Sequence, residues 1–160
     1  MDNYLNSLFE QIRLAAHEAM SKGDKYIVID KIYENRDDLS LFSFQDVLRK
    51  ILSVIEEYPT LDYGGPGPFG SFIEEHPFSD YAPMLLESLF RQPSTQVVSW
   101  LDRSVMDNDF QNGMGTNPVT PTEFASCLMS IIKNPNASVE CKEFSEMCLS
   151  DLKKRGHVNA

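Results

Sequence analysis

The chain has 160 residues, of which 42% are hydrophobic, and a formal net charge of −10. This length and composition predict one folded domain over residues 1–160 and argue against a disordered chain. No apolar run reaches the ~18–20 residues of a membrane helix, and the N-terminus lacks the pattern of a signal peptide, so we expect a cytoplasmic protein with no membrane partner.

The first 59 residues show the periodicity of amphipathic helices. In residues 4–22 one helical face is apolar, with Leu5, Leu8, Ile12, Ala15, Ala16 and Ala19. Gly23 is a typical residue for ending a helix. Residues 25–33 fit either a helix that Asp24 caps or a strand, because they include three consecutive β-branched residues. Ser43 predicts the start of the next helix and Pro59 its end.

The second half of the chain predicts further helices. They cover residues 79–90 and the segment from the cap Ser94 to Val105, and a loop rich in Gly, Asn and Asp is expected over residues 107–119. Thr120-Pro121-Thr122-Glu123 combines a cap, a proline at the first helical position and the glutamate of a capping box. After a turn at residues 134–136, the last helix is expected to bury Cys141, Phe144, Cys148 and Leu152.

These segments predict an all-α fold. The turns Arg91-Gln92-Pro93 and Asn134-Pro135-Asn136 each join two amphipathic helices and lie 43 residues apart. That spacing falls within the ~40–47 residue period of HEAT-like helix pairs. Two architectures stay open, an irregular helical bundle and a short HEAT-like stack of antiparallel helix pairs, and the spacing favours the stack.

Negative charge is concentrated in one part of the sequence. Residues 51–132 contain eleven acidic residues and only Arg91 and Arg103 as basic ones, so this segment carries −9 of the total charge of −10. A negative surface repels the phosphates of nucleic acid and attracts basic proteins. We therefore expect a basic protein partner and no nucleic acid, although the same charge would also keep a small protein soluble.

The segment DYGGPGPFG, residues 62–70, contains four glycines but does not fit a phosphate-binding loop. Such a loop needs successive backbone N–H donors, and Pro66 and Pro68 have none. We expect a rigid bend followed by a short helix that Phe69 and Phe72 anchor in the core. The glycines at 64, 65 and 67 are expected to adopt backbone angles that a side chain would strain.

Three stretches of the sequence together carry a family resemblance. They are residues 62–74 (DYGGPGPFGSFIE), residues 86–94 (LESLFRQPS) and residues 97–103 (VVSWLDR), and the turn at residues 134–136 follows them. In these stretches the chain resembles a family of bacterial contact-dependent growth inhibition immunity proteins. The resemblance implies an α-helical cytoplasmic protein that binds and neutralises one cognate toxin domain, commonly a nuclease with a basic surface.

No catalytic or metal-binding pattern is evident, so we expect no enzyme activity, no cofactor and no metal. Cys127, Cys141 and Cys148 form no C-x-x-C pair and occupy apolar helical positions, which predicts buried free thiols. A thiol enzyme pairing Cys127 with His76 is a weaker alternative, because an apolar helix face does not lower a thiol pKa. Asp107-Asn108-Asp109 resembles half of a calcium loop but lacks the correctly placed glycine and glutamate.

The candidate partner-binding residues are acidic side chains of the charged segment and aromatic residues near them. They are Glu56, Glu57, Asp62, Tyr63, Glu74, Glu75, Asp80, Trp100, Asp102, Asp107 and Asp109. The single tryptophan also fits the edge of the core. We expect an immunity protein that neutralises the C-terminal domain of a toxin, with a helical-repeat adaptor for endogenous proteins as the alternative. The oligomeric state stays open.

Overall fold

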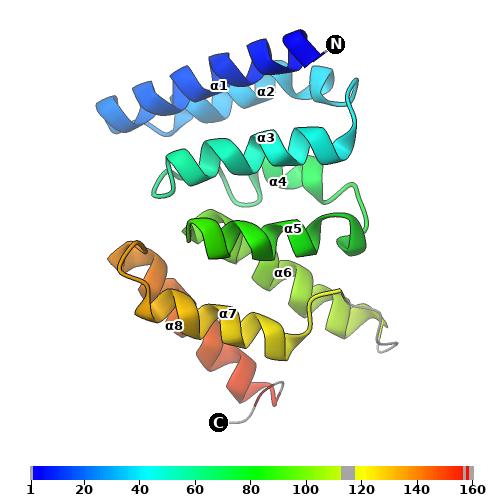
Figure 1. Cartoon of the computed structure of the whole chain (residues 1–160), viewed down its shortest axis with the longest axis vertical. Helices are drawn as coiled ribbons and strands as arrows, with labels where there is room; N and C mark the ends of the chain where they lie inside the picture. Colours follow the sequence, from blue (N-terminus) through cyan, green and yellow to red (C-terminus); the bar gives the residue numbers. More distant parts are fainter. Residues whose placement is uncertain (1, 113–117, 157, 159–160) are drawn as a thin grey trace. The chain divides into compact units, whose positions relative to one another are not determined.

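The computed structural model describes residues 2–112, 118–156 and 158, with side chains for residues 3–107, 118–156 and 158. Its regular structure consists of helices, and no strand occurs among the described residues, which confirms the predicted all-α class (Figure 1). The helices are α1 (Asp2–Lys22), α2 (Tyr26–Leu39), α3 (Phe44–Glu57), α4 (Gly67–Ile73), α5 (Phe78–Arg91), α6 (Thr95–Asn112), α7 (Pro121–Lys133) and α8 (Val139–Lys154). They form two compact units, Met1–His76 and Pro77–Ala160. The single domain over residues 1–160 stays a prediction.

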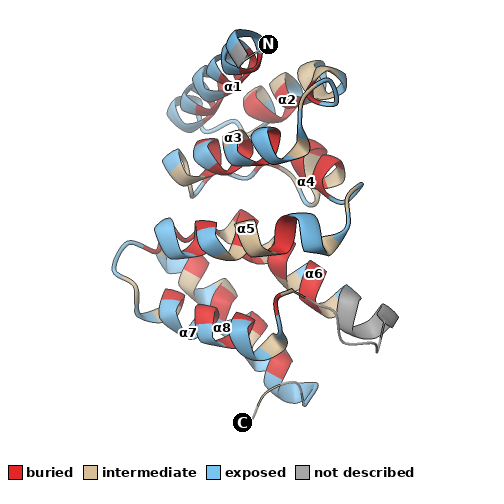
Figure 2. Cartoon of the chain, turned by 45° about the vertical axis from the view of Figure 1, so that its right-hand side comes forward, coloured by how far each residue is buried: buried red, intermediate tan, exposed pale blue. Residues whose placement is uncertain are grey.

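The first unit is built around one helix pair, in which α1 packs on α2. α3 lies against α1, and the short helix α4 lies against α2. The helices turn their buried residues toward the helices they contact and their exposed residues outward (Figure 2). The apolar face predicted for α1 is buried at each of its positions, namely Leu5, Leu8, Ile12, Ala15, Ala16 and Ala19.

The turn between α1 and α2 explains why residues 25–33 form a helix and not a strand. Gly23 ends α1 with a φ of +64°, which glycine adopts without strain. The Asp24 carboxylate then accepts a hydrogen bond of 3.0 Å from the Tyr26 N–H. The buried residues of α2 are Val28, Ile29, Ile32 and Leu39. They follow the helical period, so the burial of one helix face outweighs the strand preference of the β-branched residues.

The glycine- and proline-rich segment forms a bend that leads into α4, as predicted. Phe69 and Phe72 are buried and anchor this short helix. Gly64 has a φ of +100° and Gly67 a φ of +75°, so both need the freedom of glycine. The expectation of a strained backbone is wrong for Gly65, because its φ is not positive and an added Cβ would meet open space.

The second unit is a stack of two helix pairs. α5 packs on α6 and α7 packs on α8, while α5 also contacts α7 and α6 contacts α8. The two turns that lie 43 residues apart in the sequence meet in this unit, because Nε2 of Gln92 donates a hydrogen bond of 3.1 Å to the carbonyl oxygen of Asn136. Both pairs therefore have their turns at the same end, as the predicted stack of antiparallel helix pairs requires.

Helix starts follow the predicted caps in both units. Oγ of Ser43 accepts a hydrogen bond of 3.3 Å from the Asp46 N–H, and Oγ1 of Thr120 accepts one of 3.1 Å from the Glu123 N–H. The Glu123 carboxylate accepts the Thr120 N–H in return at 3.3 Å, which completes the capping box. None of the described helices is long and apolar enough to cross a membrane.

Two predictions for the second unit need correction. The loop expected over residues 107–119 is wrong for residues 107–112, because α6 continues to Asn112, whereas residues 113–117 lie outside the described residues. Asn and Asp have only a small disadvantage inside a helix, so their density does not by itself end one. Phe144 was expected to be buried, but α8 leaves it half-buried.

Candidate interaction surface

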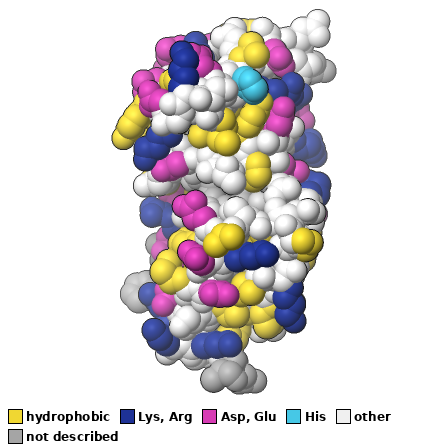
Figure 3. All heavy atoms as spheres, turned by 90° about the vertical axis from the view of Figure 1, so that its left-hand side faces the viewer, with side chains coloured by type: hydrophobic (Ala, Val, Ile, Leu, Met, Phe, Trp, Pro, Cys, Tyr) yellow, Lys and Arg dark blue, Asp and Glu magenta, His cyan; other side chains and the backbone are white. Residues whose placement is uncertain are grey.

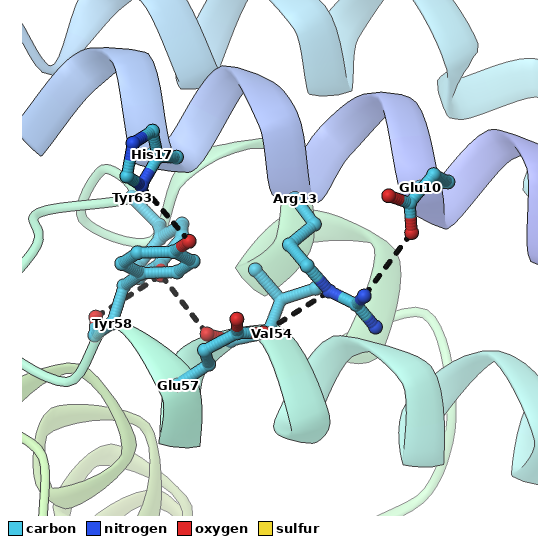
Figure 4. A network of polar contacts seen from close by, with 7 residues as sticks. All are labelled: Glu10, Arg13, His17, Val54, Glu57, Tyr58 and Tyr63. Atoms are coloured by element: carbon cyan, nitrogen blue, oxygen red, sulfur yellow. Dashed lines mark hydrogen bonds and ion pairs between the residues drawn. The ribbon is translucent and has the colours of Figure 1, made fainter.

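Glu57, at the end of α3, forms an ion pair and is not an isolated negative charge. Its Oε2 lies 3.0 Å from Nε of Arg13 on α1, and Nη1 of Arg13 donates a hydrogen bond of 3.1 Å to Glu10 (Figure 4). In the same network the Tyr58 hydroxyl lies 3.4 Å from Nδ1 of His17. Exposed ion pairs of this kind contribute at most about 1 kcal/mol to stability. The pairing links α1 to α3 and reduces the charge that Glu57 presents to a partner.

Two more of the predicted interface acids are paired with cations from the first half of the chain. Nζ of Lys25 lies 2.9 Å from Oδ2 of Asp62, and this hydrogen bond holds the pKa of Asp62 below its ordinary value. Nη2 of Arg36 lies 2.7 Å from Oε1 of Glu75. The sequence count over residues 51–132 missed these cations because they precede that segment, although the fold brings them to its carboxylates.

Asp102 on α6 is half-buried and does not belong to an exposed acidic surface. Desolvation raises the pKa of its carboxyl group, and the negative charge of Asp151 adds to this effect. Its Oδ1 atom has no hydrogen-bond partner among the described residues. A carboxylate in this position destabilises the folded state when it is ionised. Asp102 therefore offers a partner less charge than an exposed carboxylate would.

Tyr63 and Trp100 offer almost no side-chain surface to a partner. Tyr63 is 0% exposed, and its hydroxyl donates a hydrogen bond of 3.1 Å to the Tyr58 carbonyl oxygen. Trp100 is 4% exposed. Of the two roles that the sequence left open for the tryptophan, the structure therefore supports the core.

The other predicted site residues are divided between the two units. Glu56 is half-buried and Glu74 is exposed in the first unit, and Asp80 and Asp107 are exposed in the second. Asp109 lies within α6, but its side chain is outside the described residues. Glu74, Asp80 and Asp107 thus have exposed side chains, as the paired Glu57, Asp62 and Glu75 also do.

Exposed acids that the sequence reasoning missed lie on the outer faces of α2 and α8. Asp30 and Asp37 on α2, and Glu143 and Glu146 on α8, are exposed, and their side chains make no hydrogen bond or ion pair within the described part of the chain. They lie outside residues 51–132, the segment in which the excess of acidic residues predicted the interface. The positions opposite the apolar stripe of each helix would have identified them.

The excess of negative charge belongs mainly to the first unit. Residues 1–76 contain 14 acidic and seven basic residues, and residues 77–160 contain 10 and seven, which gives −7 and −3. On the face drawn in Figure 3, Lys and Arg side chains lie among the Asp and Glu side chains. Acidic side chains therefore form no continuous surface on this face, and an acidic docking surface would be limited to individual helices.

The cysteines are buried and free, as predicted. Burial raises the pKa of the Cys127 thiol to about 12 and that of Cys148 to about 12, and it raises the pKa of Cys141 as well. His76 stacks on Phe44 in the first unit with ring centroids 3.7 Å apart, whereas Cys127 is buried in the second unit. Protonated, buried thiols are poor nucleophiles, so this environment argues against the thiol-enzyme alternative. Among the described residues, no group of three or more His, Cys, Asp and Glu side chains is placed to hold a metal ion.

Comparisons with protein families, curated proteins and solved structures gave no match to this chain. The likeness to growth inhibition immunity proteins thus rests on the sequence motifs. The structure gives these motifs a local role, because the stretch at residues 62–74 forms the bend before α4 and α4 itself. The stretch at residues 86–94 forms the end of α5 and the turn before α6.

Proposed function

We propose that this chain is an immunity protein that binds the C-terminal domain of a bacterial toxin and neutralises it. The observation that carries the proposal is a set of exposed carboxylates in a chain whose charge is −10. Their side chains make no hydrogen bond or ion pair within the described residues, and they belong to Asp30, Asp37, Glu143 and Glu146. Such faces attract a basic domain and accelerate its association. A nuclease is a suitable toxin, because its substrate-binding surface has to be basic. The sequence motifs support the same proposal.

The test asks whether this chain restores the growth of cells that produce its cognate toxin domain. Cells that produce the C-terminal domain of the large toxin encoded directly upstream of this gene should stop growing, and co-production of this chain should restore growth. A toxin domain from an unrelated locus serves as the control and should not be neutralised. If the chain neither restores growth nor forms a complex with the upstream domain in size-exclusion chromatography, the proposal is wrong.

A helical-repeat adaptor is the second candidate. The hydrogen bond between the turns at Gln92 and Asn136 shows stacked helix pairs in the second unit, and such stacks commonly present binding surfaces to other proteins. An adaptor would bind two endogenous proteins at the same time. Recovery of a ternary complex with two defined endogenous proteins, together with the absence of growth rescue, would favour this candidate over an immunity protein.

A further inference from the structure

The outer face of α2 carries aromatic and acidic side chains in one line. Tyr26, Asp30, Tyr33 and Asp37 are separated by four, three and four residues, which places them on the same face of the helix. The two tyrosines are 59% and 58% exposed, and the two aspartates are exposed as well. We call these four residues the Tyr/Asp stripe. It faces away from the buried residues Val28, Ile32 and Leu39.

The charges of the Tyr/Asp stripe are not used within the fold. The side-chain carboxylates of Asp30 and Asp37 make no hydrogen bond or ion pair with any residue in the described ranges. The other carboxylates of α2 differ, because Glu34 lies 3.0 Å from Nζ of Lys31 and Asp38 accepts a hydrogen bond of 2.6 Å from the Tyr4 hydroxyl. The two aspartates are therefore available to a cation of a partner protein.

A surface hollow adjoins the stripe. It has a volume of about 390 Å³ and lies between the α1–α2 turn and the loop after α3, where Met20, Lys25, Tyr26, Leu61 and Asp62 line it. Met20 is 45% exposed, and methionine adapts to ligand side chains of different shapes. Tyr26 belongs both to the hollow and to the stripe, and Nζ of Lys25 lies 5.5 Å from its ring centroid. The hollow can accept one apolar side chain, or the stem of a long one, from a segment that lies along α2.

We propose that the Tyr/Asp stripe and this hollow form the docking surface for a segment of the partner protein that carries lysine or arginine. Asp30 and Asp37 bind its cations, the tyrosine rings contact the stems of these side chains, and the hollow takes a neighbouring apolar side chain. Tyrosine is enriched at the energetic centres of interfaces because it buries a large area at a small cost in side-chain entropy. Naming the toxin domain as the partner rests on the proposed function, whereas the chemistry of the surface does not.

The outer face of α8 is the competing surface, and its composition is less suitable. Glu143 and Glu146 are exposed there, but α8 also carries Lys142, Lys153 and Lys154, which form no ion pair within the described residues. The two cations of α2 are paired, Lys31 with Glu34 and Arg36 with Glu75. No aromatic residue of α8 is exposed, since Phe144 is half-buried. The second unit, to which α8 belongs, has a net charge of −3, compared with −7 for the first unit. The α8 face therefore provides a matched control.

The first test compares two charge reversals of the full chain in binding the upstream toxin domain. Asp30→Lys with Asp37→Lys should lower the association rate constant at least about tenfold. Glu143→Lys with Glu146→Lys changes the net charge equally and should alter that rate less than about threefold. Tyr33→Ala should raise the dissociation constant at least about tenfold. The melting temperature of each variant shows whether it is folded. Equal losses in the two double variants, or a larger loss for the α8 variant, would overturn the docking surface.

The second test does not require the toxin. A short synthetic peptide rich in arginine and leucine is titrated into the isotope-labelled full chain, and amide chemical shifts are followed by NMR. The largest shifts should map to α2 and to the turn at residues 23–25, and the Asp30→Lys, Asp37→Lys variant should abolish them. If the toxin domain fails to bind but the peptide maps to α2, the proposed function is wrong and the docking surface stands. Toxin binding that is insensitive to the α2 variants, with peptide shifts on α8, would keep the function and reject the surface.

Discussion

The carboxylate of Asp62 connects two segments of the first unit, because Oδ2 lies 2.9 Å from Nζ of Lys25 and Oδ1 accepts a hydrogen bond of 2.8 Å from the Gly64 N–H. One oxygen thus binds the residue that precedes α2, and the other stabilises the bend that leads to α4. Asp62 was a candidate partner-binding residue in the sequence. Its geometry assigns it to the fold, where its two oxygens have separate and testable roles.

Replacement of Asp62 should separate these two roles. Asp62→Asn removes the charge but keeps an oxygen for the Gly64 N–H, so the free energy of unfolding should fall by less than about 1 kcal/mol, as expected for a half-exposed ion pair. Asp62→Ala also removes the acceptor and should lower it by about 1 kcal/mol more. Urea denaturation at neutral pH measures both changes. Equal losses for the two variants would contradict the role assigned to Oδ1.

The glycines of the bend should differ in their tolerance of a side chain. A Cβ added at Gly64 would lie 2.7 Å from Cα of Gly67, and the φ of +100° at Gly64 is unfavourable for alanine. Gly64→Ala should therefore lower the free energy of unfolding by at least about 2 kcal/mol. Gly65→Ala is the matched control and should change it by less than about 1 kcal/mol, because its Cβ would meet open space. Similar thermal melting curves for the two variants would show that the bend is not constrained as described.

The helices were largely predictable because their signals are local. The cap at Ser43, the capping box of Thr120 and Glu123, and the stop at Gly23 each depend on residues at most four positions apart. Residues 25–33 stayed ambiguous because the β-branched run favours a strand locally. Packing of Val28 and Ile32 against neighbouring helices decides in favour of the helix, and a local pattern does not contain that information.

The interaction surface was less predictable because pairing across the fold is not local. Arg13 reaches Glu57 and Arg36 reaches Glu75, over 44 and 39 positions of the sequence. A count of charges along the chain treats all four residues as independent. The burial of Trp100 likewise depends on which face α6 turns toward its neighbours. The exposed aspartates of α2 were identifiable in principle, since they lie opposite its apolar stripe.

The thiols should be unreactive until the chain unfolds. Cys127, Cys141 and Cys148 are buried, and their raised pKa values keep them protonated at neutral pH. In native buffer at pH 7, an aromatic disulfide reagent such as DTNB should react slowly, at a rate limited by opening of the fold. In guanidinium chloride all three thiols should react at once. A thiol that reacts rapidly in the native protein would restore the thiol-enzyme alternative.

Asp102 should make the stability of the protein depend on pH in a defined direction. Desolvation raises the pKa of this group in the folded state, so the folded state binds the proton more tightly than the unfolded state does. Stability from this group is therefore fully present below the unfolded pKa and decreases as the pH rises through the folded pKa. Asp102→Asn imitates the neutral form and should raise the melting temperature at pH 7, while near pH 3 the variant and the original chain should melt at similar temperatures. Glu146→Gln, an exposed substitution on α8, is the control and should leave the melting temperature nearly unchanged at both pH values. If Asp102→Asn lowers the melting temperature at pH 7, the ionised carboxylate stabilises the fold, and the half-buried site has a cation or donor that satisfies it.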